Sequence, residues 1–313
     1  MSSPPAPEKP KVLRAGSRIA PFAPASPAKA ERIAAGKKEL EGLGFSVAAQ
    51  RAMDAQGYFT GSPEERRAEF LDALNDSSVD ALIGTRGGFG SVYLFDALPS
   101  VLRTVKPIVG FSDLTSLQIY LWQKHRWPTF YGPMLAAGLD AGADTLNGYD
   151  SQSFRNALMN PSSGWQTNLF GETLQPGRAE GVILGGAMTL LEATLGTPWE
   201  LDTSNAILLL EDRGMKPYQI DRVLLHLFHA GKFKNVRGII LGDFPECDPP
   251  VAGSPSVRDV AQRVLGRLKI PIIFGAPIGH TARPMLTLPL AVPARLIAEG
   301  GGTLNILEPT VRP

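Results

Sequence analysis

The stretch KPIVGFSDLTSLQIYLWQK, residues 106–124, contains a short apolar strand, a tight turn and a helix in immediate succession. Residues 106–110 predict a buried strand, and residues 113–124 have the apolar spacing of a helix. A strand that passes through a sharp turn into a helix is typical of α/β sheets with crossover helices. The turn places Ser112 at the carboxyl end of the strand, where the binding sites of such sheets gather.

The same alternation of strands and helices continues upstream of this stretch. Apolar segments predict strands at 18–22, 45–49 and 79–84. Ser26 and Pro27 are expected to be the N-cap and first residue of a helix that Gly44 ends. Ser62, followed by Pro63 and Glu65, forms a capping box that opens a second helix. We therefore predict a flavodoxin-like or glutaminase-like parallel sheet with helices on both faces.

Downstream, the periodicity fades between residues 141 and 177 and then returns. We interpret 141–178 as an interdomain connection, between an N-terminal domain at 11–140 and a smaller C-terminal α/β domain at 179–313. Residues 1–10 form a Pro-rich segment that we expect to be a flexible tail. The second half predicts strands at 179–184, 206–210, 236–242 and 270–274, and helices at 217–230 and 256–268.

Composition excludes several classes of protein. The chain has 313 residues and a formal charge of +1, which offers no basic field for nucleic acid. The single cysteine, Cys247, cannot form an internal disulfide, which suits a reducing cytoplasm. No apolar run is long enough to span a membrane, and the first residues lack the apolar core of a secretory signal. We expect a cytoplasmic enzyme that binds neither nucleic acid nor membrane.

Three reactive side chains stand where predicted strands end. Ser112 follows the strand at 106–110, Glu211 ends the strand at 206–210, and His280 lies in the loop after 270–274. Each has an ordinary alternative, because a serine in such a turn can be a helix N-cap, and acids and histidines are common at exposed strand ends. Their chain order, nucleophile then acid then histidine, is that of the α/β-hydrolases, although Leu114 breaks the G-x-S-x-G pattern.

Two other patterns resemble cofactor or metal sites, but neither has the residues that such a site requires. Glycines 84, 87, 88 and 90 follow a strand, but their spacing is not that of a dinucleotide-binding turn. His226 and His229 lie three residues apart without the glutamate or third ligand of a zinc site. We therefore expect no metal and no organic cofactor.

Six blocks give the sequence a specific resemblance. They are RGGFG (86–90), GFSDLT (110–115), YGPM (131–134), LLEDRGMKPYQIDRVL (209–224), PIGHT (277–281) and LTLPL (286–290). Over residues 11–307 the chain resembles the serine LD-carboxypeptidase family, which includes the microcin-immunity hydrolases. The resemblance implies a murein tetrapeptide carboxypeptidase of cell-wall recycling that releases the terminal D-alanine, and a homodimer.

The resemblance also implies roles for individual residues. Ser112 would be the nucleophile, His280 the base and Glu211 its orienting partner, with the backbone N–H groups of Gly88 and Asp113 forming the oxyanion hole. The alternatives are an immunity hydrolase of aminoacyl-nucleotide toxins and a non-catalytic protein that binds a small ligand. The 99-residue interval between Ser112 and Glu211 argues against the immunity hydrolase, whose relatives carry a longer insertion there.

A carboxypeptidase must also recognise a free terminal carboxylate, which suits the planar fork of an arginine. Arg86 is the first candidate because it precedes the glycines at 87 and 88. Arg213 and Arg283 are the other candidates, and all three alternatively pair with neighbouring acids.

Four positions depart from the pattern of the family, and we expect some of them to line or support the cleft. They are Tyr131 in place of a common histidine, Phe89 in place of tyrosine, Ala187 in place of asparagine and Ala291 in place of glycine.

Overall fold

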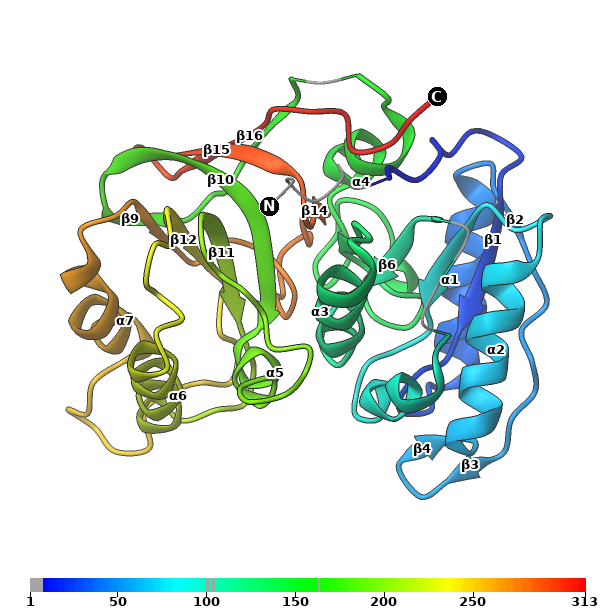
Figure 1. Ribbon diagram of the computed structural model, residues 1–313, viewed down its shortest axis with the longest axis horizontal. Coiled ribbons are helices and arrows are strands. Elements are labelled where there is room, and N and C mark those ends of the chain that lie inside the picture. The colour runs from blue at the N-terminus through cyan, green and yellow to red at the C-terminus, as the bar shows by residue number, and fades with distance from the viewer. Residues whose placement is uncertain (1–7, 100–101, 103–104, 163) are drawn as a thin grey trace.

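The computed structural model describes residues 8–99, 102, 105–162 and 164–313, so residues 1–7 of the expected tail lie outside its description. Two domains lie side by side, each with its own sheet (Figure 1). No helix in the described part of the chain is long and apolar enough to cross a membrane.

The first sheet has six strands in the order β14-β7-β6-β5-β1-β2. Its five parallel strands are β1 (Arg18–Phe22), β2 (Ser46–Val47), β5 (Ala81–Gly84), β6 (Ile108–Gly110) and β7 (Phe130–Tyr131). Numbered among themselves, these strands follow the order 2-1-3-4-5 of flavodoxin-like folds, one of the two sheet types expected. The sixth, β14 (Leu288–Pro289), comes from the far end of the chain and pairs antiparallel with β7. A separate hairpin joins β3 (Ala55–Gln56) and β4 (Phe59–Thr60).

The helices of this domain are α1 (Ala30–Gly42), α2 (Pro63–Asn75), α3 (Leu114–His125) and the 3-10 turns η1 (Ser91–Ala97) and η2 (Leu139–Ala141). The capping box at Ser62 is confirmed, because its hydroxyl accepts from the Glu65 N–H and Glu65 accepts from the Ser62 N–H. The expected start of α1 is wrong: Lys29 is the N-cap. Ser26 is instead bound to the Gly-rich turn, donating its N–H to Gly87 and accepting from Phe89.

Residues 141–178 contain regular structure. Helix α4 (Ser151–Met159) contacts β14, and its last turn accepts a hydrogen bond from Leu13 at the start of the chain. Strands β8 (Gln166–Asn168) and β9 (Glu172–Gln175) then form the two opposite edges of the second sheet.

The second sheet has eight strands in the order β8-β16-β15-β10-β11-β12-β13-β9. Its parallel centre is β10 (Gly177–Ala187), β11 (Ala206–Glu211), β12 (Gly238–Leu241) and β13 (Ile272–Phe274). The hairpin of β15 (Pro293–Ala298) and β16 (Thr303–Ile306) extends this sheet. The helices of the domain are α5 (Met188–Ala193), α6 (Pro217–His229) and α7 (Val257–Leu265), followed by the 3-10 turn η3 (Gly266–Leu268). We expected this domain to be the smaller, but its sheet is the larger, because both edges recruit strands outside the alternating βα pattern.

Strand β11 shows how the two domains share a core. Ile207 and Leu209 belong to one apolar cluster with first-domain residues such as Leu114 and Tyr131. The alternate residue Leu208 packs in a second cluster that includes α6 and α7. Since successive side chains of a strand point to opposite faces, both faces of β11 are buried. Its carboxyl end is therefore held firmly against the first domain.

Glu69 on α2 gives this fold a pH-dependent stability. The side chain is buried and accepts the Ala23 N–H just after β1, and burial raises its pKa from 4.5 to about 7. Between these values the folded state holds a proton that the unfolded chain has lost, so stability falls as pH rises from 4.5 towards 7.

We expect Glu69→Gln to stabilise the protein more at pH 8 than at pH 5, by up to about 3 kcal/mol. Glutamine cannot ionise, and its side-chain oxygen still accepts the Ala23 N–H. Denaturant unfolding of both proteins at the two pH values measures the difference. An equal change at both would show that Glu69 titrates normally.

Candidate active site

Ser112 sits on a strained turn between β6 and α3. Its φ is +61°, in the left-handed region that costs a residue with a side chain about 1–3 kcal/mol. It is not the N-cap of α3, a position that Asp113 takes. This geometry lifts the Ser112 hydroxyl out of the sheet into a cleft of about 760 Å³. A strained backbone at a serine whose hydroxyl is exposed in a cleft is typical of a nucleophile elbow.

The Gly-rich turn after β5 faces Ser112 directly. A Cβ at Gly87 would lie 2.8 Å from the Ser112 Cβ, so only glycine fits there. The Asp113 carboxylate accepts the N–H groups of Gly90 at 3.3 Å and Ser91 at 2.8 Å, which ties this turn to the turn of Ser112. Among the described residues, the N–H groups of Gly88 and Asp113 have no acceptor. Both residues line the cleft, where these N–H groups are free to bind a developing oxyanion.

Glu211 and His280 form a hydrogen-bonded pair from the second domain. Glu211 ends β11 and is completely buried, so it is not a solvated strand-end charge. Its Oε2 accepts from the His280 backbone N–H at 2.9 Å and pairs with His280 Nδ1 at 2.8 Å. A Cβ at Gly279, whose φ is +60°, would lie 2.4 Å from the Glu211 carboxyl carbon. With Nδ1 assigned as the donor, Nε2 is left to accept a proton.

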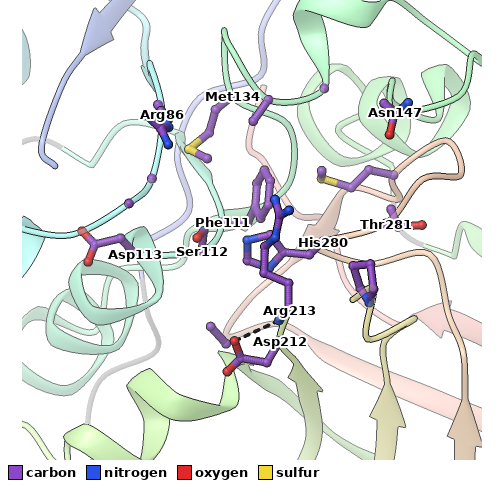
Figure 2. A pocket seen from close by; sticks show the side chains of 18 of the residues that line it. Arg86, Phe111, Ser112, Asp113, Met134, Asn147, Asp212, Arg213, His280 and Thr281 are labelled. Atoms are coloured by element: carbon purple, nitrogen blue, oxygen red, sulfur yellow. Dashed lines mark hydrogen bonds between the residues drawn. The ribbon is translucent and has the colours of Figure 1, made fainter. Parts of the chain in front are cut away.

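The structure brings the predicted site residues together from both domains. Ser112 and His280 line the same cleft, and Phe111, the residue before Ser112, packs against the imidazole with ring centres 5.1 Å apart (Figure 2). Arg86 and Asp113 line the same cleft (Figure 2). Glu211 is not among the residues that line it, because its side chain is completely buried and bonded to His280.

The three candidate arginines differ in their partners. Arg213 pairs with Glu246, and Arg283 pairs with Asp243. Arg86 donates to the Pro27 carbonyl at 2.8 Å and, within the described part of the chain, has no acidic partner. It is therefore the one of the three whose charge is uncompensated.

The four positions that depart from the family pattern have different surroundings. Ala187 lines the cleft, whereas Phe89 is an exposed residue that packs against Tyr93. Ala291 is buried with a φ of +66°, which explains why glycine suits that position. Tyr131 is completely buried and donates a hydrogen bond to Glu211, a contact that no local sequence pattern reveals.

Asp212 is a second acid that sequence reasoning left without a role. It lines the cleft and accepts from both the N–H and the hydroxyl of Thr189. Burial raises the pKa of Asp212, and the Thr189 hydrogen bonds oppose the shift. Of the two histidines on α6, His226 pairs with Glu192 at 2.7 Å. No group of three potential metal ligands occurs among the residues described.

Comparison with known proteins agrees with this architecture. Two family profiles match the chain: the LD-carboxypeptidase N-terminal domain over residues 19–132 and the LD-carboxypeptidase C-terminal domain over 180–296. A probable murein peptide carboxypeptidase of Bacillus subtilis is 33% identical over 293 residues, which are 92% of this chain and 91% of the relative.

Two solved structures share the fold. The muramoyltetrapeptide carboxypeptidase of Oxalobacter formigenes is 26% identical and aligns with a TM-score of 0.83 over 94% of this chain and 100% of that one. The microcin C7 self-immunity protein MccF is 24% identical and aligns with a TM-score of 0.89 over 97% of this chain and 100% of that one. The second likeness concerns the fold alone.

Proposed function

This chain belongs to the LD-carboxypeptidase family, and on that premise we propose that it hydrolyses the L,D-amide bond that holds the terminal D-alanine of murein tetrapeptides. The observation that carries the proposal is that Ser112 lines the same cleft as His280, whose ring is bonded to the buried Glu211. The uncompensated charge of Arg86 in the same cleft supports removal of a single terminal residue.

The proposed reaction follows from the role that each group is able to play. Ser112 Oγ attacks the carbonyl carbon of the scissile amide while His280 Nε2 takes its proton, and Glu211 stabilises the imidazolium. The N–H groups of Gly88 and Asp113 stabilise the oxyanion, and one such donor is typically worth about 3–4 kcal/mol. His280 then protonates the leaving amine of D-alanine, and water releases the tripeptide acid from Ser112 by the reverse proton transfers.

Arg86 is proposed to bind the terminal carboxylate of the substrate. We expect amidation of that carboxylate to cost the wild type about 2–4 kcal/mol in kcat/KM, because a charge pair loses one partner. Arg86→Ala should erase most of this discrimination between acid and amide. Kinetics of both substrates with both proteins measure it.

Arg213→Ala is the matched control, because Arg213 lines the same cleft but is paired with Glu246. This variant should keep the wild-type ratio of acid to amide. If Arg86→Ala still prefers the acid as strongly as the wild type does, the carboxylate binds elsewhere.

The substrate class is tested by a panel of three compounds. We expect turnover of a tetrapeptide that ends in D-alanine, at least about a hundredfold slower turnover when L-alanine replaces it, and none of an aminoacyl nucleotide. Preference for the nucleotide would instead support an immunity-type hydrolase, the alternative that the sequence leaves open.

A further inference from the structure

Tyr131 connects the first domain directly to the acid of the second. It ends β7 of the first sheet, is completely buried, and its hydroxyl donates to Glu211 Oε1 at 2.5 Å. The two residues are 80 positions apart in the chain and belong to different sheets. The contact therefore depends on how the domains meet.

The hydrogen bonds of Glu211 divide between its two oxygens. Oε2 accepts twice from His280, through its backbone N–H and its ring. Within the described chain, Tyr131 is the one donor to Oε1. A carboxylate this deeply buried is stable as an anion only while its oxygens are satisfied.

The Tyr131 hydroxyl is itself fixed by the segment that carries the nucleophile. The Ser112 backbone N–H and the Thr115 hydroxyl lie beside it, and Thr115 accepts the Ala187 N–H from β10 at 3.1 Å. Burial and the neighbouring Glu211 raise the pKa of Tyr131 well above 10, so the phenol stays protonated and remains a donor.

We propose that Tyr131 is a positioning residue that holds the Glu211–His280 pair in place against the nucleophile turn across the domain interface. The inference rests on the proposed roles of Ser112, Glu211 and His280. Tyr131 touches no substrate, and its effect passes through the charge and orientation of the Glu211 carboxylate.

Removing the hydroxyl has a defined electrostatic consequence. The Glu211 carboxylate, with one donor fewer, keeps more of its negative charge unshared and attracts the imidazolium of His280 more strongly. This moves the acidic limb of activity to higher pH. The other charged groups at this end of the second sheet are Asp212 and the ion pairs Arg213–Glu246 and Asp243–Arg283, which the substitution leaves in place.

The test is an NMR titration of the His280 ring in Tyr131→Phe, without substrate. The chain has four histidines, so few ring signals need assignment. We expect the midpoint of this ring's titration to rise by about half a pH unit or more, and the acidic limb of kcat/KM to shift with it. The fall in kcat should be larger than the rise in KM. An unchanged midpoint and limb in the folded variant would overturn the proposal.

Tyr149→Phe is the matched control. Tyr149 is also completely buried and donates to a glutamate, Glu39 Oε1, at 2.7 Å, and it is not among the residues that line the cleft. It should lose comparable thermal stability without moving the His280 titration or the acidic limb. Equal shifts in both variants would reduce Tyr131 to a structural role.

A second measurement avoids any loss of side-chain volume. Replacing the six tyrosines by 3-fluorotyrosine makes the phenol a stronger donor and leaves its shape nearly unchanged. The His280 titration should then move down, and no movement would contradict the proposal. Because the His280 titration needs no substrate, failure of the proposed peptidase activity is detected separately.

Discussion

Ser112→Ala is expected to lower kcat by about four orders of magnitude or more while the protein remains folded. In the proposed reaction the Ser112 hydroxyl oxygen forms the acyl intermediate, so no other group replaces it. It makes no hydrogen bond within the described residues and is partly exposed, so its loss removes little packing. Turnover is measured as D-alanine release, and folding as the thermal midpoint.

Ser116→Ala is the matched control for this change. Ser116 lies in the first turn of α3, close to Ser112 in sequence, and is buried outside the cleft. It should keep kcat within about tenfold of the wild type. If Ser112→Ala also stayed within that range, Ser112 would not be the nucleophile.

His280→Ala is expected to cost nearly as much as Ser112→Ala, and the double variant Ser112→Ala/His280→Ala no more than either alone. In the proposed reaction the His280 imidazole activates only the Ser112 hydroxyl, so once that hydroxyl is removed, loss of the imidazole has no further effect on the rate. Residues that act as one unit are strongly non-additive in this way. Glu211→Gln should be less damaging, because the imidazole itself remains.

A double-mutant cycle on kcat tests this coupling. We expect the coupling free energy to be almost as large as the free-energy loss from one single variant. If the free-energy losses of Ser112→Ala and His280→Ala simply added, the two residues would act independently, and the assignment of both to one catalytic unit would fail.

Features governed by local rules were predictable from the sequence. The strand, turn and helix of residues 106–124 and the capping box at Ser62 depend on neighbours a few residues away. The rule that binding sites gather at the carboxyl ends of strands singled out Ser112, after β6, and His280, after β13, but these strands belong to different sheets, so the rule alone does not place both residues in one cleft.

Features governed by distant contacts were not predictable. Strand β14 has two residues, too few to show a pattern, and its place beside β7 depends on the return of the chain to the first domain. Ser26 has the residue type of an N-cap but is bound to Gly87 and Phe89, a tertiary contact that outweighs local preference. The bond from Tyr131 to Glu211 and the pairing of Arg213 with Glu246 likewise exist only once the chain has folded.

The proposed peptidase activity of Ser112 is tested by mass spectrometry of a murein disaccharide tetrapeptide incubated with the purified wild type and, in parallel, with Ser112→Ala. We expect equimolar D-alanine and disaccharide tripeptide with the wild type, and neither product with the variant over the same time. An intact tetrapeptide after incubation with the wild type, or equal product from both proteins, would contradict it.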